Sequence, residues 1–427
     1  MPQDMLVKGK QVPKGKVVVS GAKNSATPLL AAALLAEEPV RLRNFPTQLV
    51  DAKTKMNFIR ELGAQIDIND VENTIEIVTT SLDHRAIRSY ELGIRTTYLL
   101  AAGQLIRNGI AYVPYPGGCK IGSRGYDLHM MVWRQLGCEV KETQNYLLVK
   151  GKLAGGQIDF PISTVGGTEN ALICAAVAEG HTEIRNAYIT PEVEDLIALL
   201  RQMGSQIESY GNSLIRVHGQ GSLLRGASYQ VMLDRIEALT WIIYGVMSGG
   251  EIMVEGLPFE HMDVPLLHLK EAGIDLYRNS NSVYVTPDCV QGQGIQPFEL
   301  ACGTHPGVIS DMQSFYTLLG MEANGKSRIF DYRYPERIAY AEQLNRFSPG
   351  VIEVEHGRIT TQGVAHLQGC EVQSTDLRGS MALVMAALCA EGESVVRDVH
   401  MALRGYNDLV GKLKHLGVEV KVIDRAV

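Results

Sequence analysis

The stretch PGGCKIGSR, residues 116–124, combines a single thiol with two cations on glycine-rich backbone. Cys119 is followed directly by Lys120, and Arg124 ends the stretch. Neighbouring positive charge makes a thiol more acidic and more reactive, while glycine and proline at this density mark a turn or loop. A lone cysteine is more often a small apolar residue without a chemical role. By itself the stretch therefore leaves a catalytic loop and a surface turn both open.

Five further cations stand where the sequence predicts the start of a helix. A positive side chain is unfavourable there, because the N-terminal end of a helix already carries partial positive charge and free N–H groups. An anion lying between the cation and the helix end would accept hydrogen bonds from both. One such residue is usually a solvated surface cation, whereas five at equivalent positions predict a convergent site for a polyanion. The five are Lys23, Arg95, Arg337, Arg378 and Arg404.

Asp311 is the carboxylate that we single out beside these cations. An aspartate at the start of a helix is commonly a cap. In a site that holds anions, however, a carboxylate is unfavourable unless it has a task, such as accepting a proton from a substrate hydroxyl. Asp51 and Glu192 can be simple caps, and His129 and His305 could either contact the site or satisfy a turn.

The elements that must position these residues come from an internal repeat. An amphipathic run that ends in glycine and passes into an alternating strand recurs at intervals of about 70 residues. A second signature, an apolar helix followed by a strand, lies between successive copies, so each unit predicts the order βαβαββ. Six units are expected to group three and three into two similar domains with a cleft, divided near residues 228–233; the alternative is an extended array without a cleft. The repeated glycines are Gly63, Gly137, Gly204, Gly273, Gly350 and Gly417.

Composition excludes several classes of function. The net charge of −7 and the absence of a basic run argue against a nucleic-acid partner. Apolar segments are too short to cross a membrane, and the N-terminus lacks the apolar core of a signal peptide. Seven cysteines without a CxxC pair or a histidine cluster predict neither a disulfide framework nor a metal site, and favour the reducing cytoplasm.

Motifs spread over the whole chain resemble those of the UDP-N-acetylglucosamine enolpyruvyl transferase family. The Gly-Gly-Cys loop combined with an SGAKN start is specific to that branch, whereas the related EPSP synthases share the six-unit fold without the cysteine loop. The motifs are SGAKN at 20–24, AALLAEEPV at 32–40, PGGCKIGSR with DLH within 116–129, SDMQ at 310–313, STDLR at 374–378 and RGY at 404–406.

The resemblance implies an α/β fold, a two-domain inside-out α/β barrel built from six βαβαββ repeats. One domain would span residues 22–229, and residues 1–21 with 230–427 would form the second. The implied enzyme is an enolpyruvyl (1-carboxyvinyl) transferase of peptidoglycan precursor synthesis. It moves the enolpyruvyl group of phosphoenolpyruvate to the 3′-hydroxyl of UDP-N-acetylglucosamine and releases phosphate. The implied partners are these small molecules alone, in the cytoplasm, with no metal and no organic cofactor.

The resemblance also implies roles for individual residues. Cys119 would be the general acid that delivers a proton to C3 of phosphoenolpyruvate, and Asp311 would take the proton of the acceptor hydroxyl. Lys23 would belong to the catalytic group and would hold phosphoenolpyruvate as well. The other cations that would bind phosphoenolpyruvate are Arg124, Arg337, Arg378 and Arg404. The acceptor would contact Asn24, Arg95, Thr164, Val165, Gly166 and Asp311.

The sequence departs from the family pattern at the nucleotide end. Ile162 stands where a lysine is usual, Gly125 replaces the proline that follows the loop arginine, and Thr190 replaces an acidic residue. These differences leave the residues of enolpyruvyl chemistry in place and keep two alternatives open. One is a paralogous enolpyruvyl transferase with a different nucleotide or alcohol acceptor, for example in secondary metabolism. The other is a non-catalytic member retained for binding or regulation.

Overall fold

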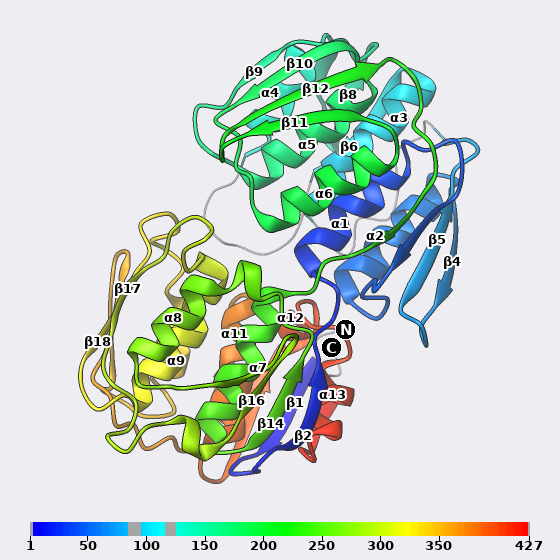
Figure 1. Ribbon diagram of the computed structural model, residues 1–427. Helices are drawn as coiled ribbons and strands as arrows, with labels where there is room; N and C mark the ends of the chain where they lie inside the picture. Colours follow the sequence, from blue (N-terminus) through cyan, green and yellow to red (C-terminus); the bar gives the residue numbers. More distant parts are fainter. Residues whose placement is uncertain (1–2, 84–94, 116–124, 426–427) are drawn as a thin grey trace. The chain divides into compact units, whose positions relative to one another are not determined.

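The computed structural model describes residues 3–83, 95–115 and 125–425 (Figure 1). These residues form two compact units. The N-terminal unit comprises the described residues between 21 and 232, and the C-terminal unit comprises residues 3–20 and 233–425. Within the described residues no helix is both long enough and apolar enough to cross a membrane.

The third repeat displays the predicted βαβαββ order in full. Its strands form one sheet in the order β11-β12-β10-β9, in which β9 and β10 are parallel and the other pairs are antiparallel. Thr190 caps the second helix and Pro191 occupies its first turn, where a missing N–H costs nothing. The elements are β9 (Gln157–Asp159), α5 (Val165–Val177), β10 (Glu179–Arg185), α6 (Pro191–Gln202), β11 (Gln206–Tyr210) and β12 (Leu214–Gln220).

The other two repeats of the N-terminal unit follow the same plan with one difference each. In the first, the initial strand comes from the far end of the unit, because β13 (Ala227–Gln230) pairs in parallel with β3. In the second, the described residues supply a sheet of three strands, β6-β8-β7. The elements of the first are α1 (Lys23–Ala33), β3 (Val40–Arg43), α2 (Val50–Glu61), β4 (Gln65–Asn69) and β5 (Thr74–Val78). Those of the second are η1 (Arg95–Leu100), α3 (Ala101–Asn108), β6 (Ile110–Pro114), α4 (Asp127–Gln135), β7 (Glu139–Glu142) and β8 (Tyr146–Lys150).

The C-terminal unit contains the fourth, fifth and sixth repeats. The fourth holds α7 (Arg235–Ser248), β14 (Glu251–Glu255), η2 (Phe259–His261), α8 (Asp263–Glu271), β15 (Tyr277–Arg278) and β16 (Ser282–Val285). The fifth holds η3 (Pro287–Cys289), β17 (Glu299–Ala301), η4 (Ser310–Met312), α9 (Gln313–Glu322), β18 (Ser327–Phe330), α10 (Ala339–Leu344), β19 (Ile352–Glu355) and β20 (Arg358–Thr361). The sixth holds β21 (Glu371–Gln373), α11 (Leu377–Cys389), β22 (Glu393–Arg397), α12 (His400–Leu403), α13 (Leu409–His415) and β23 (Val420–Asp424).

The first two strands of the chain complete sheets of this C-terminal unit. β2 (Lys14–Val18) pairs in parallel with β14 and so supplies the first strand of the fourth repeat. β1 (Gln3–Lys8) lies between β22 and β23 and is antiparallel to both. The N-terminal residues therefore close two sheets that the later sequence leaves one strand short.

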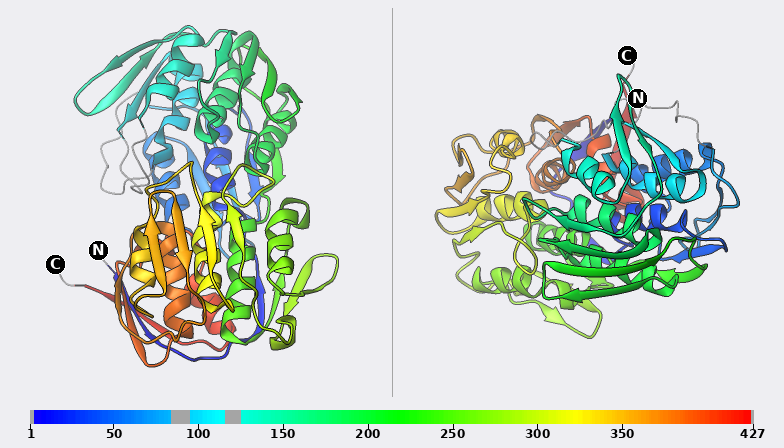
Figure 2. Two further views of the ribbon diagram at one scale, coloured as in Figure 1. Left: turned by 90° about the vertical axis from the view of Figure 1, so that its left-hand side faces the viewer. Right: turned by 90° about the horizontal axis from the view of Figure 1, so that it is seen from above.

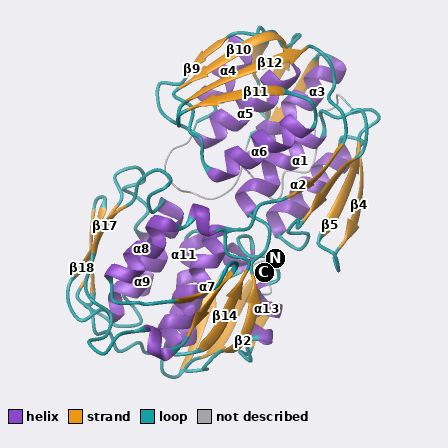
Figure 3. Ribbon diagram, viewed as in Figure 1, coloured by secondary structure: helices purple, strands orange, loops and turns teal. Residues whose placement is uncertain are grey.

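Helices occupy the interior of each unit and the sheets lie outside them (Figure 3). The further views show the same arrangement within each unit (Figure 2). In α5, α7 and α11 nearly every residue is buried, because these helices are apolar all round. Each unit has its own hydrophobic core. The predicted inside-out α/β barrel of βαβαββ repeats is confirmed.

The six glycines that mark the repeat all adopt a left-handed backbone. Their φ angles are 107°, 86°, 104°, 82°, 87° and 74° for Gly63, Gly137, Gly204, Gly273, Gly350 and Gly417, respectively. A side chain is disfavoured at such angles, so glycine is the residue that ends the helix and turns the chain into the next strand. The fifth copy differs, because α10 ends at Leu344, six residues before Gly350, and only the left-handed step into β19 is kept.

Candidate active site

Arg337, in the C-terminal unit, lies between two aspartates. Its Nη1 is 2.8 Å from Asp311 Oδ1 and its Nη2 is 2.7 Å from Asp376 Oδ1. Burial alone would lower the pKa of Arg337, but the carboxylates of Asp376 and Asp311 outweigh it and raise that pKa. Asp376 is also the N-cap of α11 and accepts hydrogen bonds from the backbone N–H groups of Arg378 and Gly379. Arg337 therefore links the start of α11 to Asp311.

Arg378 is the second buried cation of this cluster. Its Nε lies 3.7 Å from Asp311 Oδ2 and its Nη2 lies 3.9 Å from Asp234 Oδ2. The guanidinium also stacks over the ring of Tyr406 at 5.2 Å, and its Nη1 donates to the carbonyl of Gly405. Burial opposes its charge, yet Tyr406, Asp234 and Asp311 together raise the pKa of Arg378.

Asp311 is the more accessible member of this arrangement. Its side chain is 31% exposed, whereas those of Arg337 and Arg378 are 4% and 1% exposed. One carboxylate oxygen faces each arginine, so both cations fix its orientation. Asp311 lies in η4, one turn before α9, and the N-cap of η4 is Ile309, so Asp311 is not the cap residue. A carboxylate held in this way can accept a proton from a bound hydroxyl.

The structure corrects the predicted place of Arg404. The sequence pattern RGYND predicts that Arg404 opens the last amphipathic helix. Arg404 is instead the C-cap of α12, and α13 begins at Leu409 after its own cap, Asp408. The backbone of Asp408 is left-handed, with φ 50°, so residues 404–408 form a connection. Arg378 lies in the first turn of α11, and Arg337 lies two residues before the start of α10.

Replacing Arg337 by methionine is expected to destabilise the protein strongly. Arg337→Met leaves the buried carboxylate of Asp376 without its cation and Asp311 with Arg378 alone. Breaking a buried ion pair in this way costs about 3–5 kcal/mol. Urea unfolding monitored by circular dichroism measures the change in the free energy of unfolding. Arg333→Met removes an exposed arginine four residues earlier and is the matched control. Equal losses in the two variants would contradict the structural role of the pair.

Lys23 begins α1 in the N-terminal unit and pairs with Asp51 of α2 across 3.2 Å. Their side chains are 18% and 8% exposed. Ala22 caps α1 without a side-chain hydrogen bond, and the first turn of the helix has no acidic residue. Asp51 is therefore not simply a helix cap, because its carboxylate pairs with the ammonium of Lys23.

Asn24 follows Lys23 on a turn that Asp195 fixes. The Ser25 hydroxyl donates to Asp195, which also accepts from the Tyr229 hydroxyl at 2.6 Å and from the Met232 backbone at 3.3 Å. Burial raises the pKa of Asp195, and these three hydrogen bonds oppose that rise. Asp195 thus ties the first turn of α1 to the segment after β13.

Thr164, Val165 and Gly166 form the N-terminal turn of α5. Thr164 is the N-cap, and its hydroxyl accepts from the backbone N–H of Gly167 at 3.3 Å. A Cβ on Gly166 would lie 2.4 Å from the Tyr98 hydroxyl, so only glycine fits beside that ring. Tyr98 in turn stacks on His129 at 3.5 Å. The N–H groups of this turn are of the kind that bind phosphate oxygens.

Three of the predicted site residues are not placed. Cys119 and Arg124 lie outside the described residues, and of Arg95 only the backbone is described, as the first residue of η1. The described residues bring together Asp311, Arg337 and Arg378 in the C-terminal unit. In the N-terminal unit they place Lys23 and Asn24 at the start of one helix, and Thr164, Val165 and Gly166 at the start of another.

Sequence reasoning missed several charged residues that organise these clusters. Asp234 and Asp376 each cap an apolar helix and face Arg378 and Arg337, respectively. The signal was available, because both aspartates directly precede an apolar helix whose first turn carries an arginine. Lys55 and Glu169, buried in the N-terminal unit, gave no such signal.

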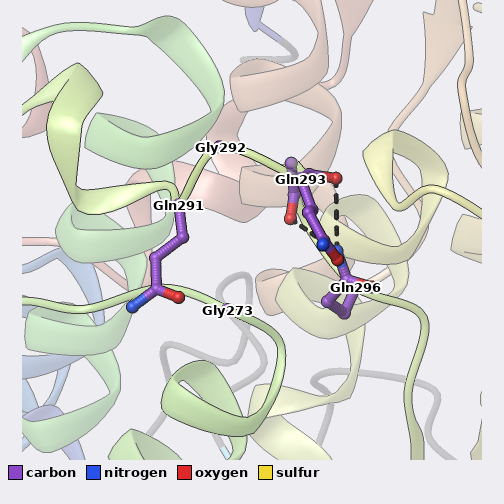
Figure 4. Close-up of a pocket in the computed structure, with 6 residues that line it drawn as sticks. Gly273, Gln291, Gly292, Gln293 and Gln296 are labelled. Carbon is purple, nitrogen blue, oxygen red and sulfur yellow. Dashed lines mark hydrogen bonds between the residues drawn. The ribbon is translucent and has the colours of Figure 1, made fainter.

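A cavity of about 230 Å³ in the C-terminal unit is unrelated to these clusters. It is lined by Gly273 and residues 291–294 and 296, all of which are glycine or glutamine (Figure 4). Gln296 donates to the backbone carbonyls of Gln293 and Gly294. No titratable side chain lines the cavity, so it offers no side-chain acid or base.

Comparison with protein families identifies the chain as a relative of known transferases. The model of EPSP synthase (3-phosphoshikimate 1-carboxyvinyltransferase) matches residues 7–413. A UDP-N-acetylglucosamine 1-carboxyvinyltransferase from Koribacter versatilis is 37% identical over 96% of this chain and 94% of its own length. One of the same name from Novosphingobium aromaticivorans is 36% identical over 98% of each chain.

The solved structures agree with this relationship. The enolpyruvyl transferase NikO from Streptomyces tendae superposes with a TM-score of 0.88 at 26% identity and covers 99% of both chains. An EPSP synthase from Acinetobacter baumannii, at 16% identity, shares the fold with a TM-score of 0.75. The chain therefore belongs to the enolpyruvyl (1-carboxyvinyl) transferase family and is a transferase enzyme.

Proposed function

We propose that this enzyme transfers the enolpyruvyl group of phosphoenolpyruvate to the 3′-hydroxyl of UDP-N-acetylglucosamine, as a cytoplasmic step of peptidoglycan precursor synthesis. The observation that carries the proposal is the orientation of Asp311 by Arg337 and Arg378. It gives the C-terminal unit a carboxylate base with two buried cations behind it. The names of the curated relatives support the choice of UDP-N-acetylglucosamine as acceptor.

The proposed reaction has two steps that conserve protons. In the first, Cys119 gives a proton to C3 of phosphoenolpyruvate, Asp311 takes the proton of the acceptor hydroxyl, and the acceptor oxygen bonds to C2. In the second, the bond between C2 and the phosphate oxygen breaks while C3 returns its proton to the Cys119 thiolate, which restores the double bond. The proton taken up by Asp311 leaves with the released phosphate. Protonation of C3 generates positive charge at C2. A nearby carboxylate stabilises that charge, and the exclusion of water strengthens this interaction.

The cations are assigned to the anionic groups of phosphoenolpyruvate. Lys23, Arg124 and Arg404 would hold the phosphate, while Arg378 and Arg404 would hold the carboxylate. Arg337 already binds two carboxylates directly, so the geometry favours a role for it in orienting Asp311. Asn24, Arg95 and the turn of Thr164, Val165 and Gly166 would hold the acceptor. No metal or organic cofactor takes part in this proposal.

Phosphate release is the experiment that tests this function. The purified enzyme is incubated with phosphoenolpyruvate and, in turn, with UDP-N-acetylglucosamine, other nucleotide sugars and simple alcohols. Release that requires both phosphoenolpyruvate and UDP-N-acetylglucosamine supports the proposal. Release with a different acceptor alone would overturn it in favour of a paralogous transferase. Binding of phosphoenolpyruvate without turnover of any acceptor would indicate a non-catalytic member.

A second candidate, a transferase with another acceptor, is favoured by one observation. Ile162, two residues before the cap of α5, is 64% exposed. The neighbouring turn of Thr164, Val165 and Gly166 is the one whose N–H groups would bind the diphosphate of a nucleotide sugar. An apolar side chain beside it contributes no charge to that binding. An acceptor that lacks the diphosphate would fit that surface equally well.

Ile162→Lys separates the two candidates. A new cation beside the turn of α5 should form a charge-assisted hydrogen bond with a diphosphate, which contributes about 1.5–3 kcal/mol. For UDP-N-acetylglucosamine we therefore expect KM to fall by about tenfold, with KM for phosphoenolpyruvate unchanged. Val12→Lys, at an exposed apolar position of the C-terminal unit, is the control. An unchanged KM for the nucleotide sugar would contradict a diphosphate at this turn.

A further inference from the structure

Lys55 is a fully buried lysine on α2 that none of the assigned roles uses. Its side chain has no exposed surface. Its Nζ donates to the carbonyl of Thr27 at 2.8 Å, and to both the carbonyl and the hydroxyl of Thr96 at 3.1 Å each. An ammonium has three N–H donors, so these three acceptors can satisfy it completely.

The three acceptors belong to two different elements. Thr27 lies on α1, one turn after Lys23 and Asn24, and Thr96 directly follows Arg95 in η1. Lys55 therefore ties the helix that begins with Lys23 to the helix that begins with Arg95. The tie consists largely of backbone acceptors, so it constrains the paths of the two segments.

The position is costly for a lysine. Burying an ammonium carries a penalty of several kcal/mol that only close hydrogen bonds and opposite charge can offset. A methionine of similar length would fill the same space without that penalty. The lysine is therefore explained better by what its three N–H groups hold than by packing.

Two charged groups, Glu169 and Lys23, act on this ammonium, and each has a further charged neighbour. Burial lowers the pKa of Lys55 to about 7, an effect that Lys23 of α1 reinforces and Glu169 of α5 opposes. Burial likewise raises the pKa of Glu169 to about 8, with Glu192 of α6 adding to the rise. Asp51, on the same helix as Lys55, neutralises Lys23. Lys55 and Glu169 are thus a buried pair, and each partly offsets the effect of burial on the pKa of the other.

We propose that Lys55 is a positioning residue for enolpyruvyl transfer: its three hydrogen bonds set the start of α1, with Lys23 and Asn24, against the start of η1, with Arg95. The proposal rests on the proposed function in one respect, the assignment of Lys23, Asn24 and Arg95 to substrate binding. Lys55 itself touches no substrate and acts through these two segments.

The test compares Lys55→Met with Lys53→Met. Lys53 is an exposed lysine on the same helix and serves as the matched control. Thermal unfolding is measured first, and kinetics are then measured at a temperature where every variant is folded. We expect Lys55→Met to lower kcat/KM for phosphoenolpyruvate by about 100-fold, the effect of a small misplacement of binding groups, while Lys53→Met keeps the wild-type value. A lowered melting temperature with wild-type kcat and KM in the folded enzyme would overturn the proposal and leave Lys55 a purely structural residue.

A double variant separates positioning from charge balance. Lys55→Met leaves Glu169 without its cation, so Glu169→Gln and the double variant Lys55→Met/Glu169→Gln are measured alongside it. If hydrogen bonds from Lys55 position the two helices, the double variant stays about 100-fold below Glu169→Gln alone. If the double variant equals Glu169→Gln, Lys55 only neutralises Glu169 and the positioning proposal is wrong.

The affinity for phosphoenolpyruvate, measured by calorimetry without any acceptor, distinguishes this proposal from the proposed function. Should the wild-type enzyme use an acceptor other than UDP-N-acetylglucosamine, the proposed function fails. Lys55→Met is still expected to bind phosphoenolpyruvate more weakly than Lys53→Met does. Equal affinities would overturn the positioning role whatever the acceptor is.

Discussion

Asp311→Asn is expected to lower kcat for phosphate release by roughly 10²–10⁴-fold, the usual contribution of a general base. The amide keeps the size of the carboxylate but accepts no proton. Arg337 retains Asp376 as a partner, so the fold should persist. Phosphate release is measured with both substrates saturating, which reports the chemical step rather than binding. Circular dichroism confirms that the variant is folded.

The control for this experiment is Asp275→Asn, at an exposed aspartate of the same unit. It should retain the wild-type kcat. If Asp311→Asn also turns over at the wild-type rate, Asp311 is not the base. Its ion pairs with Arg337 and Arg378 would then serve stability alone.

Replacement of Cys119 should have an effect of similar size. The serine hydroxyl is a far weaker acid than the thiol, so Cys119→Ser is expected to slow turnover by roughly 10²–10⁴-fold. A carboxylic acid can donate the same proton, so Cys119→Asp should retain more activity than the serine variant, increasingly so at lower pH, where the carboxyl is protonated. The measurement is kcat for both variants between about pH 5 and pH 8, which approaches the ordinary aspartic acid pKa of about 3.9 at one end and the ordinary thiol pKa of about 8.5 at the other.

Cys138→Ser is a suitable reference for the cysteine experiment, because Cys138 is buried in the core of the N-terminal unit. Burial raises the pKa of Cys138 to about 11, so it is an inert thiol at neutral pH. That variant should lose stability more than kcat. Cys119→Ser with wild-type activity would show that the loop thiol is not the acid.

The repeat was the most predictable part of this fold. Each of the six repeats carries its own helix ends and strand patterns. The turn at each repeated glycine, such as Gly204, needs a left-handed backbone. These are local properties that a sequence displays directly. The closing of two sheets by β1 and β2 is different, because it joins residues hundreds of positions apart and no local pattern reports it.

The sequence predicts which residues belong to the candidate site better than it predicts how they are arranged. The sequence predicts Arg337 and Arg378 as cations that face a bound anion at helix starts. Both also lie against aspartates of the chain, because a buried guanidinium requires compensation. Arg404 was misplaced because the glycine and asparagine after it belong to a connection rather than to a helix.

Lys55 was missed for a related reason. A lysine in an amphipathic helix is normally solvated, and only the spacing hints otherwise. Ala52 and Ile59 are buried and, at three and four residues from Lys55, lie on the same face of α2. The hydrogen bonds from Lys55 to Thr27 and Thr96 depend on tertiary packing, which the sequence alone does not display.

Mass spectrometry of the reaction product tests the central claim most directly. The enzyme is incubated with phosphoenolpyruvate and UDP-N-acetylglucosamine, and the nucleotide sugar is recovered and fragmented. The account predicts that the sugar gains one enolpyruvyl group at its 3′-oxygen, with one phosphate released for each group transferred. An unmodified nucleotide sugar, recovered while another alcohol in the same mixture carries the enolpyruvyl group, would contradict it.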